Sequence, residues 1–271
     1  MKNKKVLFTS ICNDPFVEGE MVMLYSMKKN IPNFLEHSHK IFYNDVFCKL
    51  SDENKEKIRK IIPNMQFDNI QQPSYDTANI VFEHGRPPLL TLEAFRQSEY
   101  DIVCKFDNDM LCVDDITDVL YVDGDLVGCG VGETMNCGFF VVNDKILKAT
   151  PNHYYSGMIK MIDSWKNGPA ERMNDQTAIN KSGVFQNGSI VWNHPSDDYN
   201  VRGQAYGLLD YTGKNGKTRP TAKILHWSGY MHSLAVTGKN PLSKPWDENP
   251  VGCHAQTLWE KYRDEMYEEL R

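Results

Sequence analysis

The chain has 271 residues, of which 41% are hydrophobic and 24% are charged, and its formal net charge is −6. These proportions are typical of a globular protein with a full core. The negative charge argues against a protein that binds nucleic acid over its whole surface. No apolar run approaches the ~20 residues of a membrane helix, and the apolar residues 6–8 are too few for a signal peptide.

The cysteines are odd in number and scattered, and no two are spaced C-x-x-C. Such a set is typical of free thiols in a reducing compartment, rather than of disulfides or a zinc site. We therefore expect a cytoplasmic protein without an integral membrane segment.

Strand and helix patterns alternate through the first 106 residues. The expected strands are 5–10, 39–43 and 101–106. The expected helices are 17–29, one from the N-cap Ser51 to about residue 62, and one that opens at Pro87-Pro88. This alternation predicts an α/β fold with a mostly parallel central sheet and helices on both faces.

The second half has weaker patterns. The expected strands are 125–130, 139–143 and 223–227, and the expected helices are 154–165 and 175–181. Apolar residues on one helical face of 256–271 predict a C-terminal helix packed against the body. No linker or internal repeat interrupts the chain, so we expect residues 1–271 to form a single domain.

Three short polar residues, Asp107-Asn108-Asp109, follow the strand expected at 101–106. Turn chemistry alone explains many such clusters. The two carboxylates are also suited to Mg²⁺ or Mn²⁺, which bind oxygen ligands together with a diphosphate. Because ligands of parallel sheets gather at the carboxyl ends of the strands, the location of the triplet favours a site.

Six short elements follow one another along the chain: residues 9–16 with Gly19, Val22 and Ser26; the D-x-D at 107–109; 136–143; 175–180; Tyr199-Asn200; and 226–229 with 244–246. In kind and in order they resemble the motifs of glycosyltransferase family 8, the family of glycogenin and the lipopolysaccharide galactosyltransferases. The resemblance implies a GT-A, Rossmann-like fold. It also implies a nucleotide-binding half over about 1–125, a donor-sugar and acceptor half over about 126–250, and a C-terminal helix over 254–271.

By this resemblance, three residues bind Mn²⁺ or Mg²⁺: Asp107, Asp109 and His226. Two carboxylates and an imidazole suit Mn²⁺ better than Mg²⁺. Lys244 and the backbone of Gly229 are expected at the donor phosphates. An isolated histidine of this kind is otherwise a core residue of a strand.

The resemblance also assigns residues to the remainder of the UDP-sugar donor. The uracil and ribose are expected at Thr9, Asn13, Phe16 and Asn108. The transferred sugar is expected at Asn136, Asp175 and Gln176. Phe16 stands where the family commonly has tyrosine, so it keeps the ring and loses the hydroxyl; a role in the core is the alternative.

The family retains the anomeric configuration of the sugar. An amide at Gln176 is a poor nucleophile, so we expect a front-side reaction in which the departing diphosphate serves as the base. The family often carries a basic residue in the helix before the D-x-D strand. Thr91 stands near that position here, and Arg86 or Arg96 are possible replacements.

The acceptor is expected to be a saccharide or glycolipid. A protein or a modified nucleobase in DNA is the alternative, since the basic turn 214–219 is suited to phosphate contacts, although surface solvation also explains it. Two other classes stay open: a donor-binding protein without transfer activity, and a metal-dependent phosphodiesterase. No pattern addresses the oligomeric state.

Overall fold

The computed structural model of the chain describes residues 4–80, 86–131, 134–149, 152–167, 174–182, 192–193, 195–202, 221–227, 245 and 254–271. The strands are β1 (Val6–Ile11), β2 (Ser38–Tyr43), β3 (Gln66–Asn69), β4 (Ile102–Phe106), β5 (Met110–Cys112), β6 (Leu126–Val131), β7 (Thr134–Asn143), β8 (Trp192–Asn193), β9 (Val201–Arg202) and β10 (Ile224–His226). The α-helices are α1 (Val17–Asn30), α2 (Asp52–Arg59), α3 (Pro73–Thr77), α4 (Asp144–Leu147), α5 (His153–Ser164), α6 (Asp175–Lys181) and α9 (His254–Glu269). Shorter-pitch 3₁₀ helices are η1 (Asp14–Phe16), η2 (Phe34–Glu36), η4 (Pro87–Arg96), η5 (Thr117–Tyr121), η6 (Trp165–Asn167) and η7 (Asp197–Asn200).

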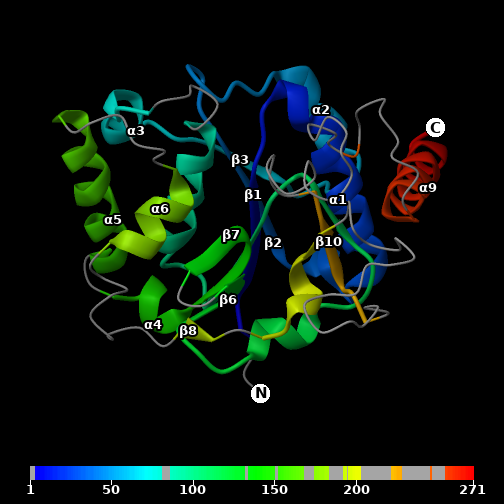
Figure 1. Cartoon of the computed structure of the whole chain (residues 1–271). Helices are drawn as coiled ribbons and strands as arrows, with labels where there is room; N and C mark the ends of the chain where they lie inside the picture. Colours follow the sequence, from blue (N-terminus) through cyan, green and yellow to red (C-terminus); the bar gives the residue numbers. More distant parts are fainter. Residues whose placement is uncertain are drawn as a thin grey trace, which may run out of the picture.

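The strands form a seven-stranded sheet in the order β3-β2-β1-β4-β7-β6-β8 and a three-stranded sheet in the order β5-β10-β9 (Figure 1). In the large sheet β7 runs antiparallel to both β4 and β6, and the other pairs are parallel. The predicted α/β class with a mostly parallel sheet is confirmed. The helix expected at Pro87-Pro88 is present as the 3₁₀ helix η4.

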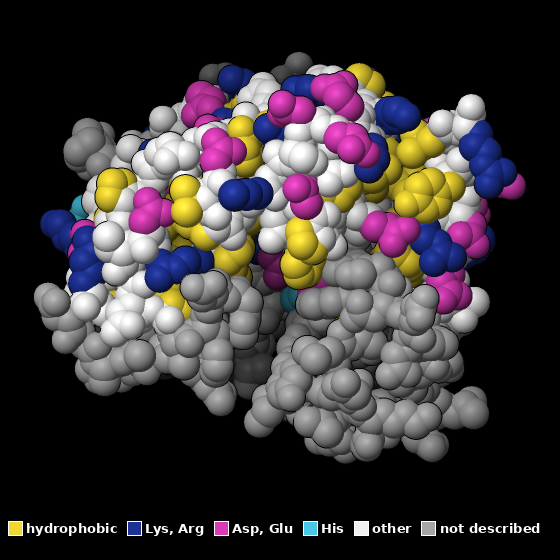
Figure 2. All heavy atoms as spheres, turned by 90° about the horizontal axis from the view of Figure 1, so that it is seen from above, with side chains coloured by type: hydrophobic (Ala, Val, Ile, Leu, Met, Phe, Trp, Pro, Cys, Tyr) yellow, Lys and Arg dark blue, Asp and Glu magenta, His cyan; other side chains and the backbone are white. Residues whose placement is uncertain are grey.

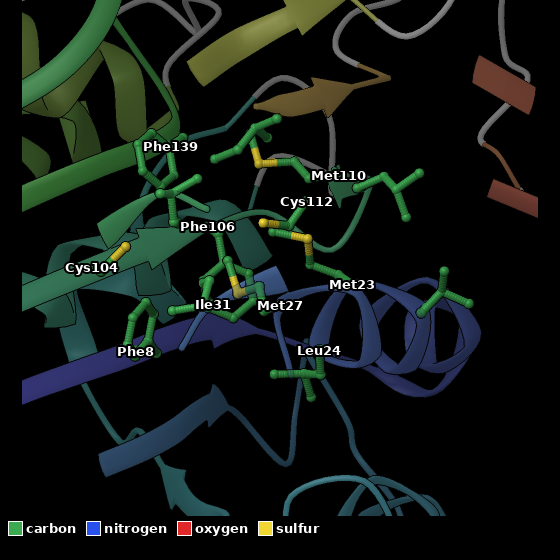
Figure 3. Packing of buried hydrophobic residues seen from close by; sticks show 14 of the residues in the cluster. Phe8, Met23, Leu24, Met27, Ile31, Cys104, Phe106, Met110, Cys112 and Phe139 are labelled. Atoms are coloured by element: carbon green, nitrogen blue, oxygen red, sulfur yellow. The ribbon is translucent and has the colours of Figure 1, made fainter. Parts of the chain in front are cut away.

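Helices cover both faces of the large sheet (Figure 1). Successive side chains of a strand point to opposite faces, and in β1 Phe8 belongs to one core while Leu7 belongs to the other. The first core packs under α1, where Met23 and Met27 meet the sheet (Figure 3). The second core packs under η4, α5 and α6 and includes Phe95.

The predicted C-terminal helix is present as α9 and packs against α1. Trp259 of α9 is fully buried in the first core. Lys28 and Lys29 at the end of α1 form ion pairs with Glu269 and Glu265. No helix in the described ranges is long and apolar enough to span a bilayer.

The cysteines that the structure describes are free and buried, in agreement with the prediction from their spacing. Burial raises the pKa of the Cys104 thiol, so it stays protonated near neutral pH. Cys253 lies outside the described residues.

Candidate metal and nucleotide site

The acidic triplet lies in the turn that joins β4 to β5, at the carboxyl end of β4. The backbone N–H of Asp107 donates to the carbonyl of Gly138 in β7 at 2.8 Å, and the carbonyl of Asp109 accepts from the N–H of Trp227 at 2.9 Å. Strand β5 pairs antiparallel with β10, with Met110 opposite His226. This pairing brings a histidine from late in the chain to the acidic turn.

The three residues predicted to bind a metal lie together. Their candidate ligand atoms are all within 4.8 Å of one another. Nε2 of His226 is 3.2 Å from Oδ1 of Asp109 and 3.8 Å from Oδ2 of Asp107. Neighbouring ligands at ~2.1 Å from one ion are about 3 Å apart, so this arrangement needs little closure to fit a divalent cation. The mixed oxygen and nitrogen set suits Mn²⁺ well.

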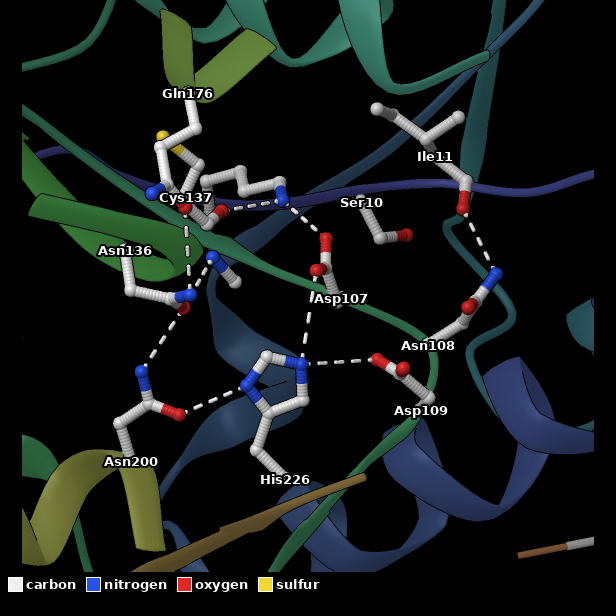
Figure 4. A network of polar contacts seen from close by, with 12 residues as sticks. Ser10, Ile11, Asp107, Asn108, Asp109, Asn136, Cys137, Gln176, Asn200 and His226 are labelled. Carbon is white, nitrogen blue, oxygen red and sulfur yellow. Dashed lines mark hydrogen bonds and ion pairs between the residues drawn. The ribbon is translucent and has the colours of Figure 1, made fainter. Parts of the chain in front are cut away.

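A chain of amide side chains holds the imidazole in this orientation (Figure 4). Nδ1 of His226 is 2.8 Å from Oδ1 of Asn200, so Nε2 faces the carboxylates. The amide of Asn200 donates to Oδ1 of Asn136 at 3.0 Å, and the amide of Asn136 donates to Oε1 of Gln176 at 3.5 Å. Residues predicted at the sugar are thus linked to a predicted metal ligand. Asn200 was not among the predicted site residues, although it belongs to the Tyr199-Asn200 element.

Close approach of β7 to the imidazole requires glycine at position 138. A Cβ there would lie 2.3 Å from Cε1 of His226 and 2.8 Å from Cε of Met110. The N–H of Gly138 donates to Oδ1 of Asn136 at 3.0 Å. The glycine of the Asn136–Asn143 element therefore provides space for the histidine.

A buried lysine lies next to the acidic turn. The ammonium group of Lys105 in β4 donates to Oδ1 of Asp107 and, at 2.7 Å, to the carbonyl of Cys137. Burial by itself would lower the pKa of Lys105, but Asp107 and Asp175 raise it above its ordinary value, so the amine is charged. Lys105 was not among the predicted site residues; the feature that could have identified it is a lysine inside an otherwise apolar strand.

Asp175 is the first residue of α6 and is buried. Burial raises its pKa to about 6, and Asp107 adds to the rise, while Lys105 opposes it. Asp175 is therefore mostly ionised near neutral pH and can accept hydrogen bonds from sugar hydroxyls.

A pocket of about 550 Å³ joins these groups to an apolar region. Its polar lining residues are Asn13, Asp107, Asn108, Asp109 and Asp175. Its other lining residues are Ile11, Phe16, Phe47, Cys48, Pro87 and Pro88. Figure 2 shows acidic and histidine side chains set back in a hollow beside hydrophobic ones. Phe47 was not predicted, because a single aromatic in the irregular stretch after 39–43 carries no motif.

The residues predicted at the nucleoside occupy different positions. Asn13 and Phe16 line the pocket, and Oδ1 of Asn13 is buried without a partner among the described residues. Asn108 also lines it and donates to the carbonyl of Ile11 at 3.1 Å. Thr9 is fully buried, and its hydroxyl donates to a backbone carbonyl of β2 at 2.8 Å, so the structure places it within the sheet and not among the lining residues.

The two residues predicted at the donor phosphates, Gly229 and Lys244, lie outside the described residues, as does the basic turn 214–219. The other predicted site residues are described.

No family model and no curated protein matches the sequence. Solved structures do match. The galactosyltransferase LgtC, crystallised with donor and acceptor sugar analogs, is 15% identical with a TM-score of 0.69, over 96% of this chain and 95% of LgtC. GlyE, a glycosyltransferase of Streptococcus pneumoniae, is 16% identical with a TM-score of 0.64, over 98% of this chain and 63% of GlyE.

Mouse xyloside xylosyltransferase 1 is 11% identical with a TM-score of 0.54, over 84% of this chain and 98% of that enzyme. At these identities the likeness is one of fold. The fold expected from the motifs is confirmed: this chain has the GT-A glycosyltransferase fold, in the arrangement seen in LgtC.

Proposed function

We propose that the protein is a metal-dependent, retaining glycosyltransferase that transfers a hexose from a UDP-sugar to an acceptor hydroxyl. One observation carries the proposal: the cluster of Asp107, Asp109 and His226 adjoins a pocket that continues into an apolar region. A nucleoside diphosphate has the matching chemistry, with an aromatic base at one end and metal-binding oxygens at the other.

The apolar end of the pocket supports uracil as the base. The ring of Phe16 provides a surface for stacking. Oδ1 of Asn13, which has no hydrogen-bond partner in the part of the chain that the structure describes, is an acceptor, and N3 of uracil carries a hydrogen that it can accept. Cytosine has a bare acceptor at that atom, so this pairing favours UDP over CDP.

The metal, held by Asp107, Asp109 and His226, would stabilise negative charge on the departing diphosphate as a Lewis acid. Asp175 accepts hydrogen bonds from hydroxyls of the transferred sugar and orients it. Gln176 lies at the sugar end of the amide chain, and its carbonyl oxygen can support positive charge at the anomeric carbon. Because an amide is a poor nucleophile, attack from the face of the leaving group is the favoured route; a trapped sugar adduct on Asp175 would contradict it.

We expect the acceptor to be a saccharide or a glycolipid. This expectation rests on the resemblance to the lipopolysaccharide galactosyltransferases. Transfer onto a protein or a nucleobase is tested by the same assay when these acceptors are supplied.

The decisive experiment is incubation of the protein with Mn²⁺ and each of several UDP-hexoses, with and without acceptor. Release of UDP with free or transferred sugar, lost in EDTA and in Asp109→Ala, would support the proposal. Formation of UMP and a sugar phosphate would instead indicate a phosphodiesterase. UDP-sugar binding without turnover in the presence of every acceptor would indicate a donor-binding protein.

A further inference from the structure

A lysine is almost completely buried beneath the candidate metal site. Lys105 is 1% exposed and lies in β4 between apolar neighbours. A charged amine is costly to bury unless opposite charges and hydrogen-bond acceptors surround it. Its retention in the core of the sheet therefore needs a specific reason.

The two carboxylate oxygens of Asp107 face different partners. Oδ1 accepts from the lysine ammonium group, which also donates to the carbonyl of Cys137 at 2.7 Å. Oδ2 faces the other side and is 3.8 Å from Nε2 of His226. The lysine thus holds one oxygen and leaves the other for a metal.

The arginines considered as basic partners of the site are bound elsewhere. Nη1 of Arg86 donates to the carbonyls of Tyr75 and Asp76, at 2.7 and 2.8 Å. Arg96 forms an ion pair with the buried Glu93. Their positive charges satisfy the end of α3 and a buried carboxylate, respectively.

Thr91, the residue of η4 near the position of the family's basic residue, is uncharged and buried. The positive charge that contacts the acidic turn is instead that of Lys105 in β4, which donates to Asp107.

We infer that Lys105 is a positioning residue of the donor site, which fixes Asp107 so that a single carboxylate oxygen faces the metal. The positive charge of Lys105 comes from strand β4, whereas the resemblance to the family predicted a basic residue in the helix before that strand. This inference rests on the proposed function, because it assumes that a metal and a nucleoside diphosphate bind together here.

The test is calorimetric binding of UDP to Lys105→Met, in Mn²⁺ and in EDTA. Methionine fits an apolar strand but cannot hold the carboxylate. The measured quantity is the ratio of the UDP affinity in Mn²⁺ to that in EDTA. We expect this ratio to be lower in Lys105→Met than in the wild type by about tenfold or more, the range seen for partners of metal ligands. The affinity in EDTA should fall less than this, because Phe16 and Asn13 are unaltered and only the repulsion between the carboxylates and the diphosphate increases.

The matched control is Lys40→Met. Lys40 is also largely buried in a strand of the same sheet, but its amine donates to Gln97 at 2.6 Å. This variant should keep the wild-type ratio. If methionine at position 105 prevents folding, Lys105→Gln is used instead; it removes the ammonium charge that pairs with Asp107 and keeps only a neutral donor, so a loss in the same direction but smaller is expected.

A folded variant at position 105 with the wild-type ratio would overturn the inference about Lys105 alone. A wild-type protein that binds UDP equally well in Mn²⁺ and EDTA would overturn both the inference and the proposed function.

Discussion

Replacement of Gly138 by alanine would test whether His226 must lie where the structure places it. The new Cβ would be 2.3 Å from Cε1 and 2.9 Å from Nδ1 of the imidazole. Carbon atoms in contact are about 3.5 Å apart or more, so the ring would have to retreat by roughly 1 Å.

A displacement of that size is incompatible with metal binding. Metal–ligand distances tolerate deviations of about 0.2 Å, and the ring is also held by Asn200 on its other nitrogen. We expect Gly138→Ala to lower the Mn²⁺-dependent gain in UDP affinity about tenfold or more. The affinity for UDP in EDTA should not change. Titration calorimetry measures both quantities.

Gly128→Ala is the matched control, because it adds the same methyl group to a neighbouring strand. Its Cβ would meet Sδ of Met135 at 2.7 Å, at the far end of a flexible side chain. The thioether can move, so this variant should bind UDP and Mn²⁺ as the wild type does. Normal metal-dependent binding by a folded Gly138→Ala protein would refute the proposed role of His226.

Three further predictions concern the base, the core and a buried acid. Phe16→Ala should weaken UDP binding in EDTA by about 1–3 kcal/mol, the value of stacking on one base; unchanged affinity would remove Phe16 from the site. Trp259→Ala should lower the free energy of unfolding by about 3–5 kcal/mol in urea denaturation, and a negligible loss would show that α9 is not part of the folded core. Burial raises the pKa of Glu20 to about 8, so the folded protein keeps a proton that the unfolded chain releases near its ordinary value of 4.5. The stability of the wild type should therefore fall relative to Glu20→Gln by about 1.4 kcal/mol per pH unit between pH 5 and 8; parallel pH profiles in EDTA would contradict this.

The longer strands could be predicted from the sequence because they carry apolar runs that need no partner to be recognised. Most of the short ones could not; β10, within the strand expected at 223–227, is an exception. β3 has one apolar residue among four, and β9 has two residues in all. Such segments become strands only because a neighbouring strand offers hydrogen bonds at the right place. The pairing of Met110 with His226 is of this kind, and it brings His226 to the candidate ligands Asp107 and Asp109.

The three predicted metal ligands could be identified from the sequence because they belong to motifs of the family that the chain resembles, and they lie together in the structure. Residues that act on those ligands were harder to find. In the sequence, Lys105 is a single polar residue in an apolar strand, and Asn200 is one residue of a dipeptide motif. Only the fold brings Lys105 to Asp107 and Asn200 to His226. Thr9 shows the opposite case: it lies in the first motif, but it is fully buried and its hydroxyl donates to the carbonyl of Lys40 in β2.

The charges of the described pocket explain why a metal should govern binding and not only turnover. Asp107, Asp109 and Asp175 contribute three negative charges and Lys105 one positive charge, which leaves −2 when His226 is neutral. A diphosphate brings further negative charge into a partly buried space, where repulsion between like charges is weakly screened. A divalent cation between them reverses the sign of this interaction. UDP binding should therefore lose its dependence on Mn²⁺ when Asp107 and Asp109 are both replaced by asparagine, which removes the repulsion together with the metal ligands.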